Sequence, residues 1–363
     1  MERYDAVVVG AGPAGSVAAR FLAESGARTL LLDKRDEIGV PVECGEFLPS
    51  IASLEEIMPD VKGLPELFDI PQSCISRPTS KIAVISPGGK RYELAFEGMS
   101  LWRARYDQHL ARLAEKSGAE LRTQTRVKGA SSEGVVTDAE AIGAKVIIGA
   151  DGPLSIVRQS LGMPAPRELT PCLQYTVPGS FGDSVDMYFG SAAPGGYAWM
   201  IPKSDGANLG LGVPPGHSGR TLKSRLESFC SGLGGHDGPK LQTSGLVPSS
   251  GPVAETVRGN VLLCGDAAGQ VMASNGGGIP IAVVCGRAAG ETAAAFLKGG
   301  TPLREYEMRW KAEVGQVLTN SLHTKKLADW WMWSDPLIGV AMRLIGKWGI
   351  RRSLTCKKLL GVY

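Results

Sequence analysis

A glycine pattern near the start of the chain constrains its fold more than any other feature of the sequence. Gly10-x-Gly12-x-x-Gly15 follows an apolar run at 4–9 and opens a stretch with helical periodicity at 13–25. A second apolar run, at 28–33, ends in Asp33, which stands 18 residues after Gly15. Strand, glycine turn, helix, strand and acidic residue in this order are typical of a βαβ unit that binds a dinucleotide. The sequence therefore predicts a Rossmann-type site.

Each part of this motif has its own chemical role. Gly10 permits the tight turn, Gly12 lets backbone N–H groups approach a pyrophosphate, and Gly15 allows the helix to pack closely on the strand. The helix N-terminus favours the phosphate charge, and Asp33 can accept hydrogen bonds from ribose hydroxyls. The motif alone fits FAD and NAD equally, so later segments have to decide the cofactor.

Composition excludes several other classes of protein. Of the 363 residues 43% are hydrophobic, and the net charge of +3 is too small to indicate nucleic acid binding. The seven cysteines form no C-x-x-C pair and no metal-ligand spacing, which favours a reducing cytoplasm and predicts no metal site. The longest uncharged stretch, 267–286, contains polar residues, three consecutive glycines and a proline, and so predicts no membrane span.

Charge is concentrated near the C-terminus. Residues 323–363 hold eight Lys/Arg against two Asp, a net charge of +6, which leaves about −3 for the rest. Trp330-Trp331-Met-Trp333 precedes an apolar stretch in which Arg343, Lys347 and Arg351 are spaced four residues apart. This pattern fits an interfacial helix on an anionic membrane, and equally a helix docked on the body with a solvated basic face. We expect a cytoplasmic protein, with peripheral contact to the inner face of the cell membrane as an open alternative.

Periodicity predicts an α/β protein, α+β in overall arrangement, whose dinucleotide domain is assembled from separated pieces. Apolar strands at 145–149 and 260–264 return to the first domain, whereas a hairpin at 81–96 and short strands over 172–213 predict an antiparallel sheet. The stretch after 302 has helical periodicity. We predict a dinucleotide-binding domain of residues 1–75, 99–165 and 255–300, an inserted antiparallel β-sheet substrate lobe of 76–98 and 166–254, and a helical C-terminal region of 301–363.

Three later segments resemble the para-hydroxybenzoate-hydroxylase-like superfamily of FAD flavoproteins. Val261-Leu-Leu-Cys-Gly265-Asp266 ends a strand in Gly-Asp and is followed by Asn275-Gly-Gly-Gly-Ile279. Leu101-Trp-Arg103-Ala-Arg-Tyr106-Asp107 is similar to the superfamily's R-x-x-[FL]-D helix start, and Asp151-Gly152 with Arg158 matches its internal Asp-Gly motif. The resemblance implies that the cofactor is FAD, that Asp266 bonds the ribityl chain, and that Arg103 contacts the cofactor.

Within that superfamily the sequence is most similar to the geranylgeranyl reductase family, which includes the archaeal digeranylgeranylglycerophospholipid reductases, over about residues 1–300. The specific segments are Pro41-Val-Glu-Cys44-Gly45-Glu46 and Pro194-Gly-Gly-Tyr197-Ala-Trp199-Met-Ile201-Pro202, where Ile201 replaces the usual Phe. Beyond Gly10, Gly12 and Gly15, the family pattern implies flavin contacts at Ala14, Asp33, Cys44, Gly45, Phe47, Arg103, Val127, Asp266, Gly278 and Ile279.

The resemblance implies an oxidoreductase of isoprenoid and phospholipid biosynthesis that acts on CH–CH groups. Tyr197 and Trp199 alternate on a predicted strand and face one side, where they either line an apolar channel for an isoprenoid chain or form the sheet core. An isolated alkene has no carbonyl to absorb charge, so hydride addition must be coupled to protonation of the other carbon. Cys44, Tyr197 and the flavin itself are the candidate proton sources, although Cys44 also fits a small buried hydrophobic residue.

The electron donor and two rival functions stay open. No second dinucleotide motif is present, so the donor is NAD(P)H bound transiently, ferredoxin or a reduced deazaflavin. A flavin-dependent monooxygenase or halogenase is one alternative, because 197–202 differs by one residue from the halogenase pattern Trp-x-Trp-x-Ile-Pro. A non-enzymatic prenyl carrier, like the Rab GDP-dissociation inhibitors of similar fold, is the other; the glycine motif with Asp33 and Asp266 argues against it.

Overall fold

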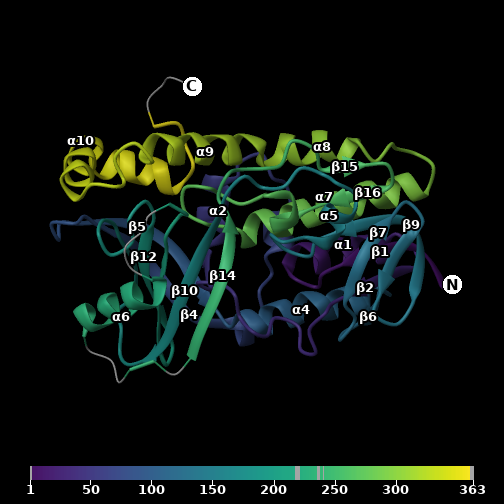
Figure 1. Ribbon diagram of the computed structural model, residues 1–363, viewed down its shortest axis with the longest axis horizontal. Coiled ribbons are helices and arrows are strands. Elements are labelled where there is room, and N and C mark those ends of the chain that lie inside the picture. The colour runs from purple at the N-terminus through teal and green to yellow at the C-terminus, as the bar shows by residue number, and fades with distance from the viewer. Residues whose placement is uncertain (1, 217–220, 235–237, 240, 360–363) are drawn as a thin grey trace.

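Two sheets and a layer of helices make up the protein. The computed structural model describes residues 2–216, 221–234, 238–239 and 241–359. In Figure 1 the strands of the first sheet lie at one end of the long axis, those of the second sheet at the other, and the C-terminal helices run along one long side. This arrangement confirms the predicted α/β fold with an antiparallel lobe and a helical C-terminal region.

The first sheet has the strand order β15-β16-β9-β1-β2-β6, and all of these pairs are parallel except β15 with β16. Two further strands, β7 and β8, extend it through β9. Its strands are β1 (Glu2–Val9), β2 (Thr29–Leu32), β6 (Glu120–Arg122), β7 (Val127–Ser131), β8 (Gly134–Thr137), β9 (Ala141–Gly149), β15 (Val257–Arg258) and β16 (Val261–Leu263). The strands predicted at 4–9, 28–33, 145–149 and 260–264 are therefore parallel neighbours, although the chain between them is long.

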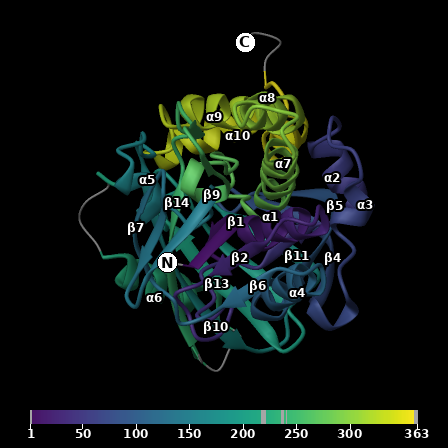
Figure 2. The ribbon, with the colours of Figure 1, turned by 90° about the vertical axis from the view of Figure 1, so that its right-hand side faces the viewer.

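Both faces of the first sheet are covered, as the continuous apolar run at the end of β1 requires. Ala6 and Val8 belong to the core that also contains residues of α1 (Pro13–Glu24), α4 (Arg103–Lys116) and α7 (Ile279–Leu297). Val7 and Val9 instead face a smaller core with β7, β8 and α5 (Ile156–Ser160). Figure 2 shows α1 lying between α4 and α7.

The second sheet has the order β14-β10-β13-β12-β11-β4-β5-β3 and is antiparallel except where β11 pairs with β4. The predicted hairpin is confirmed as β4 and β5, and the predicted short strands as β10 to β13. The strands are β3 (Phe47–Pro49), β4 (Ile75–Ile85), β5 (Arg91–Leu101), β10 (Leu169–Pro178), β11 (Ser184–Tyr188), β12 (Tyr197–Lys203), β13 (Gly206–Gly212) and β14 (Leu241–Pro248). α6 (Leu222–Leu233) packs on β10 and β13.

Strand β3 crosses the predicted domain division. It lies within the segment 1–75, yet Phe47 to Pro49 pair with Ser100 to Gly98 of β5 in the second sheet. α2 (Ile51–Ile57), α3 (Leu64–Leu67) and the 3₁₀ turn η1 (Gln72–Cys74) then lead into β4. The chain therefore enters the second sheet once before the hairpin, and the proposed domain bounds stay a prediction.

The C-terminal helices are part of the body and not an appendage to it. α8 (Glu305–Trp310), a π-helical turn η3 (Lys311–Gly315), α9 (Gln316–Ala328) and α10 (Asp335–Leu354) follow one another along the layer seen in Figure 1. Tyr306 and Trp310 are 0% and 4% exposed. α10 is broken at Gly346, where φ is 55°, so the cationic stripe predicted on one continuous helix is interrupted between Arg343 and Lys347.

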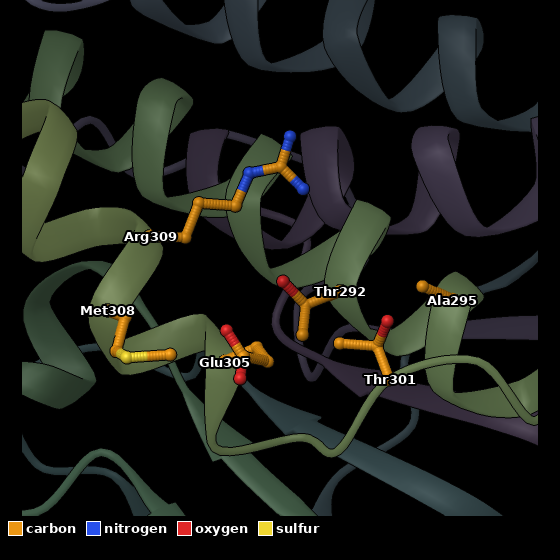
Figure 3. A pocket seen from close by; sticks show the side chains of 6 residues that line it. All are labelled: Thr292, Ala295, Thr301, Glu305, Met308 and Arg309. Atoms are coloured by element: carbon orange, nitrogen blue, oxygen red, sulfur yellow. The ribbon is translucent and has the colours of Figure 1, made fainter.

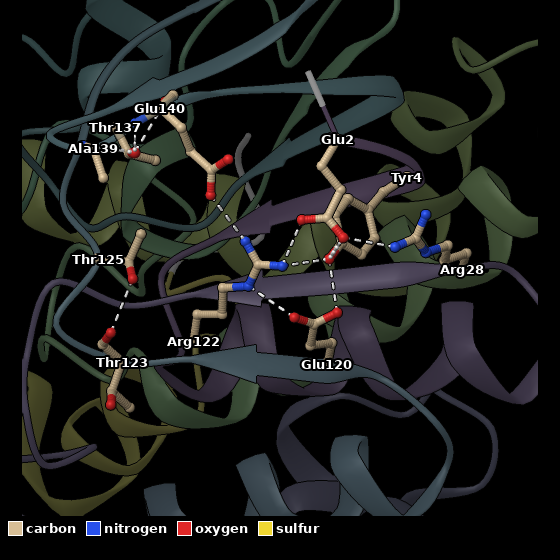
Figure 4. A network of polar contacts seen from close by, with 10 residues as sticks. All are labelled: Glu2, Tyr4, Arg28, Glu120, Arg122, Thr123, Thr125, Thr137, Ala139 and Glu140. Carbon is tan, nitrogen blue, oxygen red and sulfur yellow. Dashed lines mark hydrogen bonds and ion pairs between the residues drawn. The ribbon is translucent and has the colours of Figure 1, made fainter.

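A polar network ties the first three strands of the dinucleotide sheet together at their edge (Figure 4). The Tyr4 hydroxyl donates to Glu120 Oε2 at 2.7 Å, and Arg122 Nη2 donates to the same hydroxyl and to Glu2 Oε2, both at 2.7 Å. The Arg28 guanidinium lies 4.3 Å from the centroid of the Tyr4 ring. Burial and the hydrogen bond to Glu120 raise the pKa of Tyr4 above its usual range, and the bond from Tyr4 lowers the pKa of Glu120.

Replacing Tyr4 by Phe tests how much this network stabilises the fold. We expect the free energy of unfolding to fall by about 1 kcal/mol at neutral pH, because Glu120 and Arg122 lose a shared partner. A lowered carboxyl pKa stabilises the folded state above the unfolded pKa, so the difference should shrink below about pH 4, as Glu120 becomes protonated. Urea unfolding curves measured over pH provide both numbers.

The matched control is Tyr106→Phe. The Tyr106 side chain is 1% exposed, and its hydroxyl has no hydrogen-bond partner among the described residues. Removing that hydroxyl should leave stability unchanged or raise it. Equal losses from the two substitutions would show that the Tyr4 network contributes nothing specific.

Candidate active site

The first glycine turn and the Gly-Asp turn near residue 265 touch each other. Gly10 has a φ of 99°, and a Cβ on Gly15 would lie 1.9 Å from Gly10 O, so neither position accepts a side chain. A Cβ on Gly12, which caps α1, would meet nothing within 4 Å. A Cβ on Gly265 would lie 2.9 Å from Ala14 Cβ. One extended dinucleotide can therefore contact both turns, with open space above Gly12 for its diphosphate.

Asp33 follows β2, as the motif requires, and its carboxylate is already held by the backbone. Oδ2 accepts from the Ala11 N–H and Oδ1 from the Arg35 N–H, both at 2.8 Å. A carboxylate has acceptor positions beyond these two, so ribose hydroxyls can still be bound. The Thr125 N–H donates to Asp33 O at 2.8 Å, which brings the start of β7, and with it Val127, to the same end of the sheet.

The Gly-Asp turn is held rigidly from two sides. It forms a short 3₁₀ helix, η2 (Gly265–Ala268), whose first N–H donates to Gln270 Oε1 at 2.9 Å, and Gln270 Nε2 donates to the Tyr306 hydroxyl of α8. Arg158 donates to Ala267 O and to Pro153 O, both at 2.9 Å. Arg158, predicted as part of the Asp-Gly motif, thus links that motif to the Gly-Asp turn.

Asp266 carries a half-buried carboxylate without a hydrogen-bond donor among the described residues. Burial raises the pKa of its carboxyl to about 6, although the nearby Arg103 charge opposes this shift. Within the described residues no hydrogen bond or ion pair reaches this carboxylate. A Cβ on Gly278, the residue that caps α7 just before Ile279, would lie 3.6 Å from Asp266 Oδ1. An acceptor of this kind at a helix N-terminus fits a ligand that brings its own hydroxyl donors.

Arg103 connects this region with the Cys44 loop. Its guanidinium makes two hydrogen bonds to Asp107, at 3.1 and 3.0 Å, and these side chains are only 12% and 7% exposed. The Cys44 sulfur lies close enough to this guanidinium to help raise its pKa. The Arg103 N–H donates to Glu46 Oε1 at 2.9 Å, so α4 begins against the same loop. Arg103 therefore lies beside Cys44 and Asp107, and its positive charge acts on the carboxylate of Asp266.

The Cys44 loop rests on strands of the second sheet. Gln174 Nε2 donates to Cys44 O at 3.2 Å, and Trp199 Nε1 donates to Gln174 Oε1 at 2.9 Å. A Cβ on Gly45 would lie 3.0 Å from Ile201 Cδ1. The loop is thus placed between the dinucleotide side and strand β12, and residue 201 sets how closely it approaches that strand.

Tyr197 and Trp199 lie on one face of β12, as their alternation predicted, and this face is turned to the Cys44 loop. Their ring centroids lie 5.9 Å apart, and both side chains are half-buried. The Tyr197 hydroxyl donates to Asn275 O at 2.5 Å, which connects β12 to the glycine run before α7. Burial, followed by the neighbouring Cys172 and Cys44, raises the pKa of Tyr197 above its usual range. The phenol is therefore neutral, and its proton is engaged.

Sequence comparisons agree with this geometry. Residues 169–240 match the family described as "Geranylgeranyl reductase catalytic domain", and residues 8–49 match "NAD(P)-binding Rossmann-like domain". A digeranylgeranylglycerophospholipid reductase of Methanocaldococcus jannaschii is 35% identical over 358 residues, which cover 90% of this chain and 87% of that protein. Digeranylgeranylglycerophospholipid reductase 2 of Methanopyrus kandleri is 35% identical over 352 residues, 89% of this chain and 86% of that protein. The chain belongs to the geranylgeranyl reductase family.

Solved structures agree with this assignment. A geranylgeranyl bacteriochlorophyll reductase-like protein from Thermoplasma acidophilum superposes on the reductase with a TM-score of 0.81 at 30% identity, covering 93% of this chain and 90% of that one. The flavin-dependent brominase Bmp2 superposes with a TM-score of 0.70 at 16% identity over 97% of this chain and 92% of that one, which shows a shared fold alone. The reductase thus has an NAD(P)/FAD-type Rossmann domain on the fold of known flavoproteins.

Phe47 is placed differently from the other predicted cofactor residues of the reductase. It lies in β3 with its ring against β5, because a Cβ on Gly98 would be 2.6 Å from that ring, and its centroid is 6.4 Å from that of Phe96. The side chain therefore packs on the second sheet. A cofactor contact from Phe47 would come from its backbone.

Sequence reasoning missed the polar cluster that shapes the Cys44 loop. Glu46 has a φ of 71° and a buried carboxylate, which Lys203 Nζ and Asn208 Nδ2 both contact at 2.7 Å. The side chains of Lys203 and Glu46 are 2% and 8% exposed, and the Lys203 ammonium lies 4.2 Å from the centroid of the Trp102 ring. The available signal was a lysine at the end of an apolar strand, directly after Pro202.

A separate surface pocket lies away from this site. It has a volume of about 410 Å³ and is formed by α7, the loop after it and α8 (Figure 3). None of the predicted site residues is among its lining residues, which are Thr292, Ala295, Thr301, Glu305, Met308 and Arg309. α7 is also the one helix in the described part of the chain that is long and apolar enough to cross a membrane, and 83% of its apolar window is buried, as in a core helix.

Asp266→Asn tests whether the reductase holds a carboxylate that has no protein partner and a raised pKa. A carboxyl with a raised folded pKa costs stability above that pKa, so the cofactor-free wild type should lose stability as pH rises from about 4 to about 6. Asn has no such titration. We expect the cofactor-free variant to be more stable above pH 6, by at most about 3 kcal/mol for a shift near two pKa units, and to bind flavin more weakly.

Chemical unfolding of the cofactor-free proteins between pH 4 and 8 provides this measurement. Asp60→Asn, at an exposed position, serves as the control and should follow the wild type over the whole range. A constant difference between Asp266→Asn and the wild type would contradict the raised pKa.

Proposed function

We propose that this reductase uses FAD to saturate isolated C=C bonds in the geranylgeranyl chains of an archaeal ether phospholipid. The relatives named digeranylgeranylglycerophospholipid reductase, similar over nearly the whole chain, support this substrate class. The observation that carries the proposal is the position of the Cys44 loop, which accepts a hydrogen bond from the Arg103 N–H through Glu46 on the dinucleotide side and one from Gln174 on the aromatic side. A redox group and an apolar chain can meet there.

The residues present fit FAD. Open space above Gly12 and the start of α1 suit a diphosphate, and the donor-free carboxylate of Asp266 suits hydroxyl groups of a ribityl chain. Gly278 and Ile279 would offer the N-terminus of α7, and Arg103 a buried cation. When bound and reduced, FAD supplies the hydride for the alkene carbon.

The chain's own residues have three tasks in this proposal. Trp199, Tyr197 and Phe189 form an aromatic row, with 5.7 Å between the ring centroids of Phe189 and Tyr197, which holds an apolar chain and excludes water. The Cys44 loop positions the reacting bond. A proton donor at the second carbon then completes the addition, because an alkene cannot accept hydride alone.

Cys44 is a better proton donor than Tyr197 in this geometry. The Tyr197 proton lies in a hydrogen bond of 2.5 Å to Asn275 O, and burial raises the pKa of this phenol. The Cys44 sulfur accepts from the Glu46 N–H at 3.1 Å, which leaves its own S–H hydrogen free. The electron donor is NAD(P)H, ferredoxin or a reduced deazaflavin, and anaerobic mixing of the FAD-loaded enzyme with each in turn would identify it.

Cys44→Ala tests the role of the thiol. We expect turnover of the chemically reduced enzyme to fall at least 100-fold, a common effect of removing a general acid, with flavin content retained. Tyr197→Phe should cost less than about 10-fold, because the hydroxyl mainly holds β12 to Asn275. Mass spectrometry of a prenyl lipid counts the hydrogen pairs added.

Cys172→Ala is the control for the first substitution, since this neighbouring thiol lies on β10 and keeps Cys44 intact. Full turnover by Cys44→Ala would remove Cys44 as the donor. Oxygen or halide in the product would instead favour the monooxygenase or halogenase alternative, and a protein that stays colourless after addition of FAD would favour the prenyl carrier.

A further inference from the structure

Exposed apolar side chains lie on the segment between α9 and α10 and along α10, on both sides of its break at Gly346. Trp330 and Trp333 of the connecting segment are 82% and 64% exposed. On α10, Leu344 is 81% exposed, and three further apolar residues are between 42% and 63% exposed. We call these residues the elbow surface: Trp330, Trp333, Leu337, Val340, Leu344 and Trp348.

This exposure is unusual for a helix docked on a protein body. The inward face of α10 is already apolar, since Ile338, Met342 and Ile350 are at most 4% exposed. Such a helix normally turns polar residues outward. In the connecting segment, Trp333 Nε1 donates to Trp330 O at 2.7 Å, so the polar atom of that indole is satisfied within the segment. Both faces of α10 therefore present hydrocarbon, and only one of them is covered.

Unpaired cations flank the elbow surface. Lys326, Arg343 and Lys347 are exposed, and none of them forms an ion pair with a carboxylate in the described residues. Arg351, the third member of the predicted cationic stripe, instead pairs with Glu56 of α2 at 2.6 Å. Tryptophan rings beside apolar residues and free cations match the chemistry of an anionic bilayer surface, where rings enter the interface and cations meet phosphates.

Both ends of α10 contact the segments that hold Tyr197. At its start, the Gly195 N–H donates to Met332 O at 3.1 Å, and a Cβ on Gly190 would lie 2.7 Å from Asp335 Oδ1. At its end, Asn275 Nδ2 donates to Leu354 O at 3.2 Å, and Asn275 O accepts from the Tyr197 hydroxyl. The elbow surface is thus on the outer side of the helix whose two ends contact the residues around β12.

We propose that the elbow surface docks on an anionic lipid bilayer and that lipid chains pass from this contact to the strand bearing Tyr197 and Trp199. The proposal that the protein docks on a bilayer depends only on the elbow surface. The proposal that a lipid chain is delivered to β12 also rests on the proposed function. A face that covers the substrate strand on one side and binds lipid on the other spares a long apolar chain any exposure to water.

Vesicle flotation with the full-length protein tests docking. Wild type should bind phosphatidylglycerol vesicles more tightly than phosphatidylcholine vesicles, with the difference lost at high salt. A triple variant, Trp330→Ser/Leu344→Ser/Trp348→Ser, should bind both at least ten-fold more weakly. Arg343→Gln/Lys347→Gln should weaken binding to phosphatidylglycerol by about five-fold per charge and leave phosphatidylcholine unaffected.

Val136→Ser/Leu241→Ser provides the matched control, because Val136 and Leu241 are 51% and 54% exposed and lie on β8 and β14, away from α10. This variant should bind vesicles like the wild type. Wild type that fails to bind phosphatidylglycerol, or equal losses in control and triple variant, would overturn docking. A wild-type dimer that the triple variant converts to monomer would overturn it too, since the elbow surface would then join two copies.

Turnover measurements distinguish delivery of the lipid chain from the reduction of its double bonds. With a geranylgeranyl lipid presented in vesicles, the triple variant should lose activity, whereas with the same lipid dispersed in detergent it should match the wild type. Equal activity of both proteins on vesicles would overturn delivery. Absence of reduction in either presentation, with vesicle binding still dependent on the elbow surface, would refute the proposed function and leave docking supported.

Discussion

The site depends on a backbone contact between α1 and α7, helices that are separated by more than 250 residues of chain. A Cβ on Gly286 would lie 2.3 Å from Ala14 O, and one on Gly290 would lie 2.5 Å from Ala18 O. Small residues on both helices let the two backbones meet. This contact sets the Gly-Asp turn against the first glycine turn, so the two turns form one continuous site.

The close contact between α1 and α7 also buries polar groups around the two turns. Gln270 and Arg158 satisfy the backbone of the Gly-Asp turn, and Lys203 with Asn208 satisfies Glu46 in the Cys44 loop. Asp266 differs, because its half-buried carboxylate has no donor among the described residues. A carboxylate left without a donor between two such turns indicates the place of a ligand.

Local patterns in the sequence predicted the parts of this structure that depend on local order. The strands beside Gly10 and Asp266, the hairpin before residue 96 and α7 each carry periodicity strong enough to identify them. β3 was missed, because its three residues form a strand only through pairing with β5. The partners of Cys44 were missed for the same reason: Gln174 and Arg103 reach it from distant elements, and a single sequence contains no record of such contacts. Domain limits depend most on distant contacts, because a strand such as β3 can leave its own segment and pair in the other sheet.

The hydrogen bond from Gln270 to Tyr306 has a consequence for how the C-terminal helices are regarded. Glu307 and Trp310 in the same stretch reach Thr256, just ahead of β16, so α8 completes the core beneath the cofactor turn. This region is consequently not an autonomous module. A chimaera that exchanged this region between relatives would have to carry matching residues at 256 and 270. Otherwise polar groups in its core would lose their hydrogen-bond partners.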